Sequence, residues 1–495
     1  MKRTNAFDSL RTLKKPKELK DKEKSFVYPD FGSTTNQFAK VGDEYIFNLK
    51  QTEKISFQGL VEIEPLTGSI KVNGHVTSNK VTVYSGLLGV YTVEPVKSDF
   101  KSERTLPFKT IYTVFAVRQL PYEISGLDYP QLKNIFPEFK LESSLLPIEY
   151  KDSQLKNLEG IICIVGSKNS GKSTLAKYIS NQFETVCFLD CDLGQPEFTP
   201  NGIVSLHVLD EPILGPSFTH QKVPYHGIFI GSSSAKHNPD EYFNSIIQLV
   251  NIYRANLSHL PLVVNTSGWV KGVGYDLLIS LIRELQPSHL ISLEHPDPSK
   301  NIDLQDFNTI KIDAVPDDSK SKINATDQRN LVTGSYFVKR DLIWDFKSLP
   351  AAHPYRVKFS SVRIKFLNEE VPFSQTLYAL NAQIVGLVVD STNYHSESCK
   401  MFKGLVPSHT PLNQNCVGLG LIRAVDPAEQ CFYVLTPVPS DILQNVNLFL
   451  KGSIECPLYL FTNGYKNDPY VSFDNIEGVG GLETRNRHLG RKRLQ

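Results

Sequence analysis

The residues from Gly166 to Leu175, GSKNSGKSTL, have the clearest chemical potential in the sequence. They match G-x-x-x-x-G-K-[ST] and lie between a β-branched run, GIICIVG, and a helical pattern, KSTLAKYISNQF. Glycines let such a loop turn its backbone N–H groups toward phosphate oxygens, and the helix that follows adds its positive end. We expect Lys172 to reach the β- and γ-phosphates and Ser173 to ligate Mg²⁺. The residues expected to hold the nucleotide are Gly166, Ser167, Lys168, Asn169, Ser170, Gly171, Lys172, Ser173 and Thr174.

This motif leaves the destination of the terminal phosphate open. P-loops serve ATPases, GTPases and small-molecule kinases alike. The guanine-reading motif N-K-x-D does not occur in the sequence, which weakens the case for a GTPase without excluding it.

Two aspartates follow the next apolar run. Asp190 and Asp192 lie in FLDCDLGQPEFTP, at the carboxyl end of a predicted strand. Ligands bind at this edge of a doubly wound sheet, and residues two apart on an extended strand point the same way, so both carboxylates can face the phosphates. One can hold Mg²⁺ and the other can take the proton from an attacking hydroxyl. The alternative is one metal-linked aspartate and one that caps a turn.

The elements around these residues alternate between strands and helices. TVCFLDCDL, LPLVVNTSGW and SHLISL read as strands, and DEYFNSIIQLVNIYRANL and YDLLISLIREL read as helices. This alternation predicts an α/β fold with a doubly wound parallel sheet. Apolar–polar alternation on both sides of that core, as in EYIFNLKQTEKISFQGLVEIEP and RVKFSSVRIKF, predicts flanking β-rich domains. Further C-terminal strands are expected over TLYALNAQIVGLVVD, CVGLGLIRAVD, CFYVLTPVP and SIECPLYLF.

Length and composition agree with several globular domains. The chain has 495 residues, of which 40% are hydrophobic and 21% charged. We expect a disordered basic tail over residues 1–40, a β domain over 41–150, a P-loop domain over 151–348, a β-rich domain over 349–478 and a basic tail over 479–495.

Charge and cysteine content exclude little by themselves. The formal net charge of +1 argues neither for nor against nucleic acid, so local patches must decide that question. We find no apolar run of about 18 residues and no apolar core in the N-terminal tail, and so expect neither a membrane span nor a secretory signal.

The seven cysteines lack CxxC pairs, which favours reduced thiols inside the cell. Cys187 and Cys191 lie in an apolar run and are expected to pack rather than to bind metal.

Five motifs, in this order, carry a family resemblance: GSKNSGKST, LDCDLGQPEFTP, GIFIGSSSAKHNPDEY, VVNTSGWVKGVGYDLL and DQRNLVTGSYF. Together they resemble the polynucleotide 5′-hydroxyl kinases of the Clp1/Grc3 (Nol9) family, in which β domains flank the kinase core. The segment CVGLGLIRAVDPAEQCFYVLTPVP is more similar to the Grc3/Nol9 branch, which processes pre-rRNA. The resemblance implies that the γ-phosphate of ATP goes to the 5′-hydroxyl of an RNA end.

The resemblance also implies roles for individual residues. Asp192, beside Gln195, falls at the position of the general base, and Asp190 would then serve the metal. Ser233 matches a hydroxyl residue that holds the acceptor end, although GSSS alone is equally an ordinary turn. Trp269 matches a tryptophan that stacks on the acceptor nucleotide; considered alone it would be a core residue. Thr266 and Gly268 shape its turn, and Lys271 is either an RNA-backbone contact or a solvated lysine. The residues expected to contact the RNA are Gln195, Ser233, Thr266, Trp269 and Lys271.

A lid arginine is the last residue that the resemblance assigns. Arg329 matches an arginine that closes over the phosphates and neutralises charge on the transferring group. Clp1-type lids carry a second arginine where this chain has Gly334, so a two-arginine lid is in doubt. Lys339 and Arg340 are the basic residues that could compensate.

Each basic tail has more than one interpretation, and for the C-terminal one the alternative to a docking role is a disordered solvated tail or a nuclear address. The N-terminal lysines, Lys14, Lys15 and Lys17 among them, form a nuclear address, an RNA-binding arm or a solvated tail. In the resembled branch the kinase works with a HEPN-type endonuclease, Las1, whose cut in the second internal spacer of pre-rRNA leaves the 5′-hydroxyl. The basic C-terminal segment RNRHLGRKRLQ is the candidate docking tail. The resemblance thus implies a nuclear, nucleolar protein. Two alternatives to the kinase function stay open: an ATP-binding scaffold of an RNA-cleavage complex and an RNA-stimulated ATPase.

Overall fold

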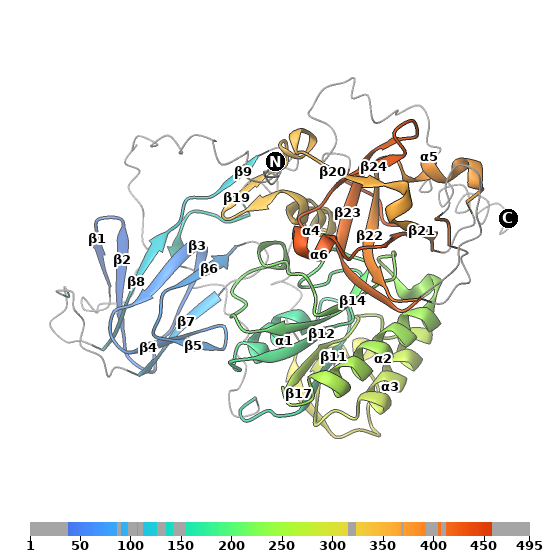
Figure 1. Cartoon of the computed structure of the whole chain (residues 1–495). Helices are drawn as coiled ribbons and strands as arrows, with labels where there is room; N and C mark the ends of the chain where they lie inside the picture. The colour runs from blue at the N-terminus through green and yellow to red at the C-terminus, as the bar shows by residue number, and fades with distance from the viewer. Residues whose placement is uncertain are drawn as a thin grey trace, which may run out of the picture.

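The computed structural model describes residues 38–86, 91–97, 106, 112–125, 135–141, 155–314, 323–367, 371–392, 404–406 and 412–457. Three regions rich in β-structure are visible in Figure 1: an N-terminal one in blue, a central one covered by helices in green, and a C-terminal one in orange. Residues 1–37 of the predicted N-terminal tail and the whole predicted C-terminal tail, 479–495, lie outside the described residues. The prediction that the disordered tail extends to residue 40 was wrong, because β1 (Phe38–Val41) pairs with β2 (Glu44–Leu49) from residue 38 on.

The central sheet has seven strands in the order β14-β13-β12-β15-β11-β16-β17. Five of them, from β12 to β17 in that order, are parallel, which confirms the predicted parallel sheet. β13 and β14 extend it with antiparallel pairing, which the sequence analysis did not predict. The strands are β11 (Ile161–Gly166), β12 (Val186–Asp190), β13 (Ile203–Leu209), β14 (His226–Phe229), β15 (Leu262–Asn265), β16 (His289–Glu294) and β17 (Thr309–Asp313).

Helices cover both faces of this sheet because its buried strands are apolar on both sides. In β11, Ile162 and Ile164 pack in one hydrophobic cluster with α1 (Lys172–Ser180). Cys163 and Val165, which point the other way, pack in the cluster that includes α2 (Pro239–Asn256) and α3 (Val273–Leu285). Figure 1 shows α2 and α3 side by side. Cys187 and Cys191 are buried in the same cluster, as predicted.

The N-terminal region is a nine-stranded antiparallel sheet around Phe57, Phe115 and other fully buried apolar side chains. Its long strand β3 alternates buried and half-buried residues, which confirms the alternation seen in the sequence. The strands are β1 (Phe38–Val41), β2 (Glu44–Leu49), β3 (Ile55–Pro65), β4 (Ser69–Val72), β5 (His75–Thr77), β6 (Val81–Ser85), β7 (Tyr91–Lys97), β8 (Thr113–Gln119) and β10 (Lys140–Leu141).

The C-terminal region is a six-stranded sheet in the order β20-β24-β23-β22-β25-β21. Two strand predictions were wrong in part: Thr376–Leu380 forms helix α5, and residues 453–457 of SIECPLYLF form no strand. The preceding run LFLK forms β25 instead, paired with β21 and β22. The elements are β20 (Tyr355–Lys358), β21 (Arg363–Phe366), α5, β22 (Gln383–Asp390), β23 (Gln414–Asp426), β24 (Cys431–Leu435), α6 (Ser440–Leu443) and β25 (Leu448–Lys451).

Both flanking regions are joined to the central one by backbone contacts. β9 (Glu123–Ser125) pairs in parallel with β19 (Ile343–Asp345), which follows helix α4 (Ala325–Val338) and β18 (Lys339–Arg340). On the other side, the C-terminal sheet meets the edge of β14: the Gly227 N–H donates to Asn415 Oδ1 at 3.1 Å. Ser453 N–H donates to the Gly231 carbonyl at 2.7 Å.

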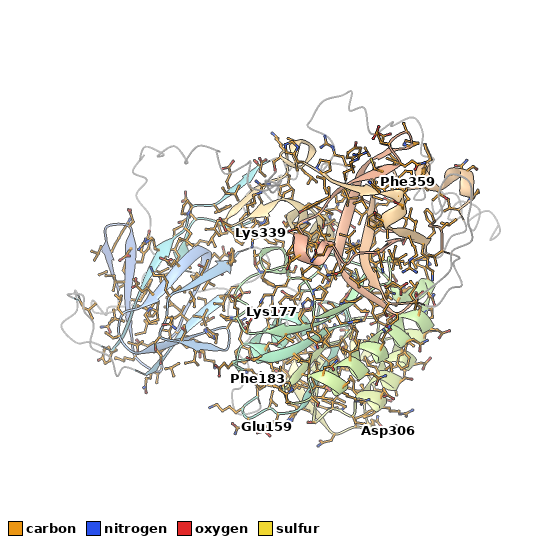
Figure 2. All side chains as sticks on the ribbon, in the orientation of Figure 1. Glu159, Lys177, Phe183, Asp306, Lys339 and Phe359 are labelled. Carbon is orange, nitrogen blue, oxygen red and sulfur yellow. The ribbon has the colours of Figure 1, made fainter. Side chains whose placement is uncertain are left out.

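A buried group of charges lies where the N-terminal sheet meets the central one, near Lys177 in Figure 2. Lys177 Nζ is 3.1 Å from Glu197 Oε1, and His220 Nε2 is 2.9 Å from the same oxygen. Tyr91, from β7, shares a side-chain hydrogen bond with Lys177. Burial alone would raise the pKa of Glu197, but Lys177 and His220 outweigh it and hold the pKa below its ordinary value. No helix in the described part of the chain is long and apolar enough to cross a membrane.

Candidate active site

The phosphate loop connects β11 to α1 as predicted. Gly166, Asn169 and Gly171 have φ of 159°, 61° and 101°, so the loop needs left-handed backbone at its centre and at the helix N-cap. The ammonium of Lys172 donates to the carbonyls of Gly166 and Ser167, both at 2.9 Å. Burial lowers the pKa of Lys172 to about 8, and the nearby carboxylate of Asp192 acts in the opposite direction. The lysine is therefore already placed at the loop that would receive the phosphates.

The other loop residues divide by exposure. Lys168, Asn169 and Thr174 are exposed, and Ser167 and Ser173 are half-buried, so their side chains can be reached by a ligand. Ser170 is buried, and its hydroxyl has no hydrogen-bond partner in the structure. Its backbone N–H donates to the Ser167 carbonyl at 3.2 Å, which tightens the loop.

Ser173 and Asp190 are linked through a residue that the sequence analysis missed. Asn265, the last residue of β15, has its side-chain nitrogen 3.3 Å from Ser173 Oγ and 3.2 Å from Asp190 Oδ1. Asp190 also accepts from the backbone N–H groups of Glu197 at 2.6 Å and Asp192 at 3.3 Å. The motif VVNTSGW contains Asn265 at a strand end, and this position was the available signal.

These groups fit a magnesium ion brought in with a nucleotide. Asp190 is fully buried, and this burial raises the pKa of its carboxyl to about 8, so a cation nearby would favour the ionised form. Asn265 Oδ1 is a buried oxygen without a hydrogen-bond partner. Among the described residues no cluster of three or more His, Cys, Asp or Glu could hold a metal alone. Ser173 and Asp190 therefore suit an ion that takes most of its ligands from phosphate and water, as Mg²⁺ does.

Asp192 lies in a turn just beyond β12, because the strand ends at Asp190. Its Oδ1 accepts from the N–H groups of Gly194 at 2.9 Å and Gln195 at 3.1 Å. The carboxylate thus caps a turn and also acts electrostatically on Lys172. The two alternatives for this residue are not exclusive: turn contacts through Oδ1 fix the side chain that faces the phosphate loop.

The segment with Ser233 packs on the turn of Asp192. A Cβ atom added to Gly194 would lie 3.3 Å from the Ser233 carbonyl oxygen and 3.4 Å from Asp192 Oδ1. The side chain of Ser233 is exposed. Three residues on, Lys236 places its ammonium 5.9 Å from the centre of the Trp269 ring. The exposed segment therefore lies between the aspartate and the tryptophan.

Trp269 is half-buried beside the phosphate loop. A Cβ atom on its neighbour Gly268 would lie 2.9 Å from Lys168 Cα, so the tryptophan turn contacts the P-loop backbone. An open pocket of about 350 Å³ is lined by Trp269 and Lys271 together with residues of the loop. Thr266, by contrast, is buried and donates its hydroxyl to the Ile164 carbonyl at 2.7 Å. Its side chain joins the end of β15 to β11. The expected contact of Thr266 with RNA is therefore not supported, because its hydroxyl is buried and already donates to the backbone.

Arg329 lies in the second turn of α4, the helix after β17. The preceding residue, Gln328, accepts from the Gln195 side chain at 2.5 Å, so this helix contacts the turn of Asp192. Arg329 donates to Thr326 Oγ1 at 3.1 Å within the helix. Gln328 was not predicted; its only signal was its place in the motif DQRNLVTGSYF.

The structure shows where Gly334 and the two basic residues that could compensate for a second arginine lie. Gly334 is buried within α4, so its position does not face solvent. Lys339 donates to the Thr219 carbonyl, and burial lowers the pKa of its ammonium. Arg340 lines a crevice with Leu349 and His353 beside the C-terminal sheet. Neither basic residue that could compensate is therefore placed at the phosphate loop.

Fold and site define the class of protein: a P-loop phosphotransferase, with polar side chains from the ends of β12 and β15 beside the phosphate loop. The family model described as the mRNA cleavage and polyadenylation factor CLP1 P-loop matches residues 166–339, and the NOL9-like C-terminal domain matches residues 350–457. The chain is 34% identical over 355 residues to the polynucleotide 5′-hydroxyl-kinase NOL9 of Arabidopsis thaliana, covering 92% of that protein and 65% of this chain. The chain belongs to the NOL9/Grc3 family of polynucleotide 5′-hydroxyl-kinases.

Other relatives extend this comparison. The nol9 kinase of Dictyostelium discoideum is 26% identical over 597 residues, covering 92% of this chain and 87% of that protein. The human NOL9 kinase is 30% identical over 355 residues, covering 60% of this chain and 49% of that protein. A solved structure of Clp1p with Pcf11p covers 85% of this chain and 99% of its own, with a TM-score of 0.53 at 14% identity, which shows a common fold.

Proposed function

We propose that the protein transfers the γ-phosphate of ATP to the 5′-hydroxyl at the end of an RNA strand. The observation that carries the proposal is the convergence of Lys172, Asp192 and Trp269 at one edge of the central sheet. A phosphate-binding lysine alone would also suit an ATPase. A carboxylate beside it and an aromatic ring at the same edge together suit a nucleotide acceptor that brings its own hydroxyl.

The roles of the residues follow from their contacts. Lys172 exchanges the carbonyls of Gly166 and Ser167 for phosphate oxygens, and the loop N–H groups bind the remaining oxygens. Ser173 and Asp190 would hold Mg²⁺, which would supply neutralisation of charge on the transferring group. Asp192 accepts the proton of the 5′-hydroxyl. The N–H groups of Gly194 and Gln195 hold its carboxylate in the orientation for this transfer.

Ser233, Trp269 and Lys271 position the acceptor in line with the phosphate. Trp269 offers a ring for the terminal base, and Ser233 offers an exposed hydroxyl on a segment whose backbone packs on the turn of Asp192. Positioning of this kind is most of what phosphoryl transfer requires of a protein. Arg329, on the helix that contacts the turn of Asp192, closes over the phosphates.

One labelling experiment separates this function from its alternatives. The protein is incubated with γ-labelled ATP, Mg²⁺ and a 5′-hydroxyl oligoribonucleotide, and labelled RNA is expected. Lys172→Ala is expected to abolish the label. Bound nucleotide without labelled RNA would favour a scaffold, and labelled phosphate released to water would favour an RNA-stimulated ATPase.

We further propose that the RNA is pre-rRNA cut in its second internal spacer by a Las1-type HEPN endonuclease, in the nucleolus. The match to the NOL9-like C-terminal domain over residues 350–457 supports this branch. The basic segment 485–495 is the proposed docking tail for the nuclease. Co-purification of the full chain with such a nuclease, lost when the segment is removed, is the expected result; unchanged co-purification would reject the tail as the contact.

A further inference from the structure

The pocket beside Trp269 extends beyond the residues that the proposed function uses. Its lining includes His295 and Lys300, from the segment after β16. Ser167, Lys168 and Lys271 line it as well. Every ionisable side chain that lines it is basic, and neither the sequence analysis nor the family motifs assigned a role to His295 or Lys300.

The hydrogen bonding of His295 shows how its ring is arranged. The backbone N–H of Asp297 donates to His295 Nδ1 at 2.9 Å, so a neutral ring carries its proton on Nε2. Lys300 Nζ lies 3.3 Å from that Nε2. The two side-chain nitrogens thus lie side by side at the rim of the pocket, close enough to contact the oxygens of one anionic group.

One acidic side chain, that of Asp297, reduces the positive charge at this rim. The exposed carboxylate of Asp297 accepts from the Ser299 N–H at 3.0 Å, and its pKa is lowered by these Ser299 contacts and by the charges of Lys300 and His295. The rim therefore carries cations whose attraction for an anion is partly offset by a neighbouring carboxylate. Removal of a cation from the rim should therefore weaken the binding of an anion, and removal of the carboxylate should strengthen it.

We propose that His295 and Lys300 bind the first phosphodiester of the acceptor strand, on the 3′ side of the terminal nucleotide that stacks on Trp269. The proposal rests on the proposed function and deepens it: the site selects a polynucleotide end over a free nucleoside. Three features favour the acceptor backbone over the base of ATP: the basic rim, the open shape of the pocket and the aromatic ring within it.

The test is a thermodynamic cycle between protein and acceptor. Lys300→Ala is expected to raise the KM for a 5′-hydroxyl oligonucleotide by about 3- to 10-fold and to reduce the slope of log KM against log salt by about 0.7, the share of one single-strand phosphate. An oligonucleotide with an uncharged methylphosphonate at its first linkage is expected to bind both proteins equally. Equal losses with the methylphosphonate and the natural linkage would overturn the assignment.

A substitution expected to act in the opposite direction and a matched control complete the experiment. Asp297→Asn keeps the oxygen that caps Ser299 and is expected to lower the KM for the natural oligonucleotide, and no decrease would count against the proposal. Lys311→Ala removes a lysine from the neighbouring strand β17, where it pairs with Glu294 at 3.2 Å, and is expected to change the KM little. If Lys300→Ala raised the KM for ATP instead, the pocket would belong to the donor nucleotide and this proposal would fail. Absence of labelled RNA with the unaltered protein would reject the proposed function itself.

Discussion

At the residue scale, the site depends on side chains whose orientation is fixed by backbone N–H groups. Asp190 accepts from Glu197 and Asp192, and Asp192 accepts from Gly194 and Gln195. Both aspartates therefore stand where they do without relying on a bound ligand. Their environments differ, however: Asp190 is fully buried, whereas Asp192 is half-buried and faces Lys172.

Substitution of Asp192 by asparagine tests the assignment of the base. Asparagine keeps the Oδ1 that accepts from Gly194 and Gln195 but cannot take a proton, so kcat is expected to fall by about 10²- to 10⁴-fold with little change in ATP binding. The rate of transfer to a 5′-hydroxyl oligonucleotide, measured beside nucleotide affinity, is the check. A near-normal rate in Asp192→Asn together with a collapsed rate in Asp190→Asn would reverse the two roles.

His207, on β13, predicts a pH dependence of stability. Burial, with smaller contributions from Lys222 and His220, lowers its pKa from 6.5 to about 3. The stability that neutral His207 contributes is present above pH 6.5 and is lost as the pH falls, because the unfolded chain takes up the proton first. The loss between pH 6.5 and pH 5 is about 2 kcal/mol.

Replacement by glutamine isolates this contribution. His207→Gln removes the titrating ring, so its urea-unfolding midpoint is expected to change less between pH 7 and pH 5 than that of the unaltered protein. Parallel pH profiles for the two proteins would show that His207 does not titrate in this window.

Much of the residue-level site could be predicted from the sequence, and the reason is local. The P-loop, Asp190 and Asp192 are set by strand ends and glycine turns within short segments. Asn265 and Gln328 could not be predicted from spacing, because their contacts join segments far apart in the chain, Asn265 to Ser173 and Gln328 to Gln195. An asparagine or glutamine has many surface roles, and spacing alone does not reveal its partner.

At the element scale, the segment with Ser233 is held between the central sheet and the C-terminal sheet. The segment that follows β14 leads to Ser233, and at Gly231 it meets the turn after β25. A Cβ atom added to Gly452 would lie 2.3 Å from the Gly231 carbonyl oxygen and 2.4 Å from its Cα. These backbones can pass so closely only because both residues lack a side chain. The C-terminal sheet therefore sets the position of the segment that presents Ser233.

A methyl group at this crossing is expected to disturb acceptor binding selectively. Gly452→Ala should displace the Ser233 segment and raise the KM for the oligonucleotide by about tenfold or more, while nucleotide binding at the P-loop changes less. Steady-state kinetics with each substrate varied in turn is the measurement. The matched control is Ser453→Ala, which removes a 3.3 Å side-chain contact to Gly231 but keeps the backbone hydrogen bond. Equal changes in both KM values for Gly452→Ala would contradict this positioning role.

The predictions of strands were wrong where pairing between distant segments decides the structure. The apolar run of β13, IVSLHVL, was not recognised as an antiparallel extension of the sheet, because a buried run does not disclose its direction of pairing. LFLK and SIECPLYLF are both apolar, and only the pairing with β21 and β22, on either side, selects the first as a strand of the sheet.

At the scale of the whole molecule, buried charges join the N-terminal sheet to the catalytic core. Lys177 on α1, Glu197 after β12, His220 and Tyr91 on β7 share one set of contacts. The backbone N–H of Glu197 also donates to Asp190. The position of the metal-side carboxylate is thus linked by one residue to the packing of the flanking domain.

Breaking this group is expected to destabilise the whole chain. Glu197→Gln leaves the ammonium of Lys177 buried without its counter-charge, at a cost of about 3–5 kcal/mol in unfolding free energy. The midpoint of urea unfolding measures the loss. Glu284→Gln, which removes an exposed partner 3.0 Å from Arg254, should cost less than about 1 kcal/mol. Similar losses in the two variants would show that the buried group contributes no special stability.

The pairing of β9 with β19 has a consequence for any attempt to shorten the protein. A fragment limited to residues 151–348 would keep β19 but lose β9, and it would also strip the covering from the outer edge of β14. Unpaired strand edges invite association between copies. Soluble, monomeric material should accordingly be harder to obtain from this fragment than from the full chain, even though every residue assigned to catalysis is inside it.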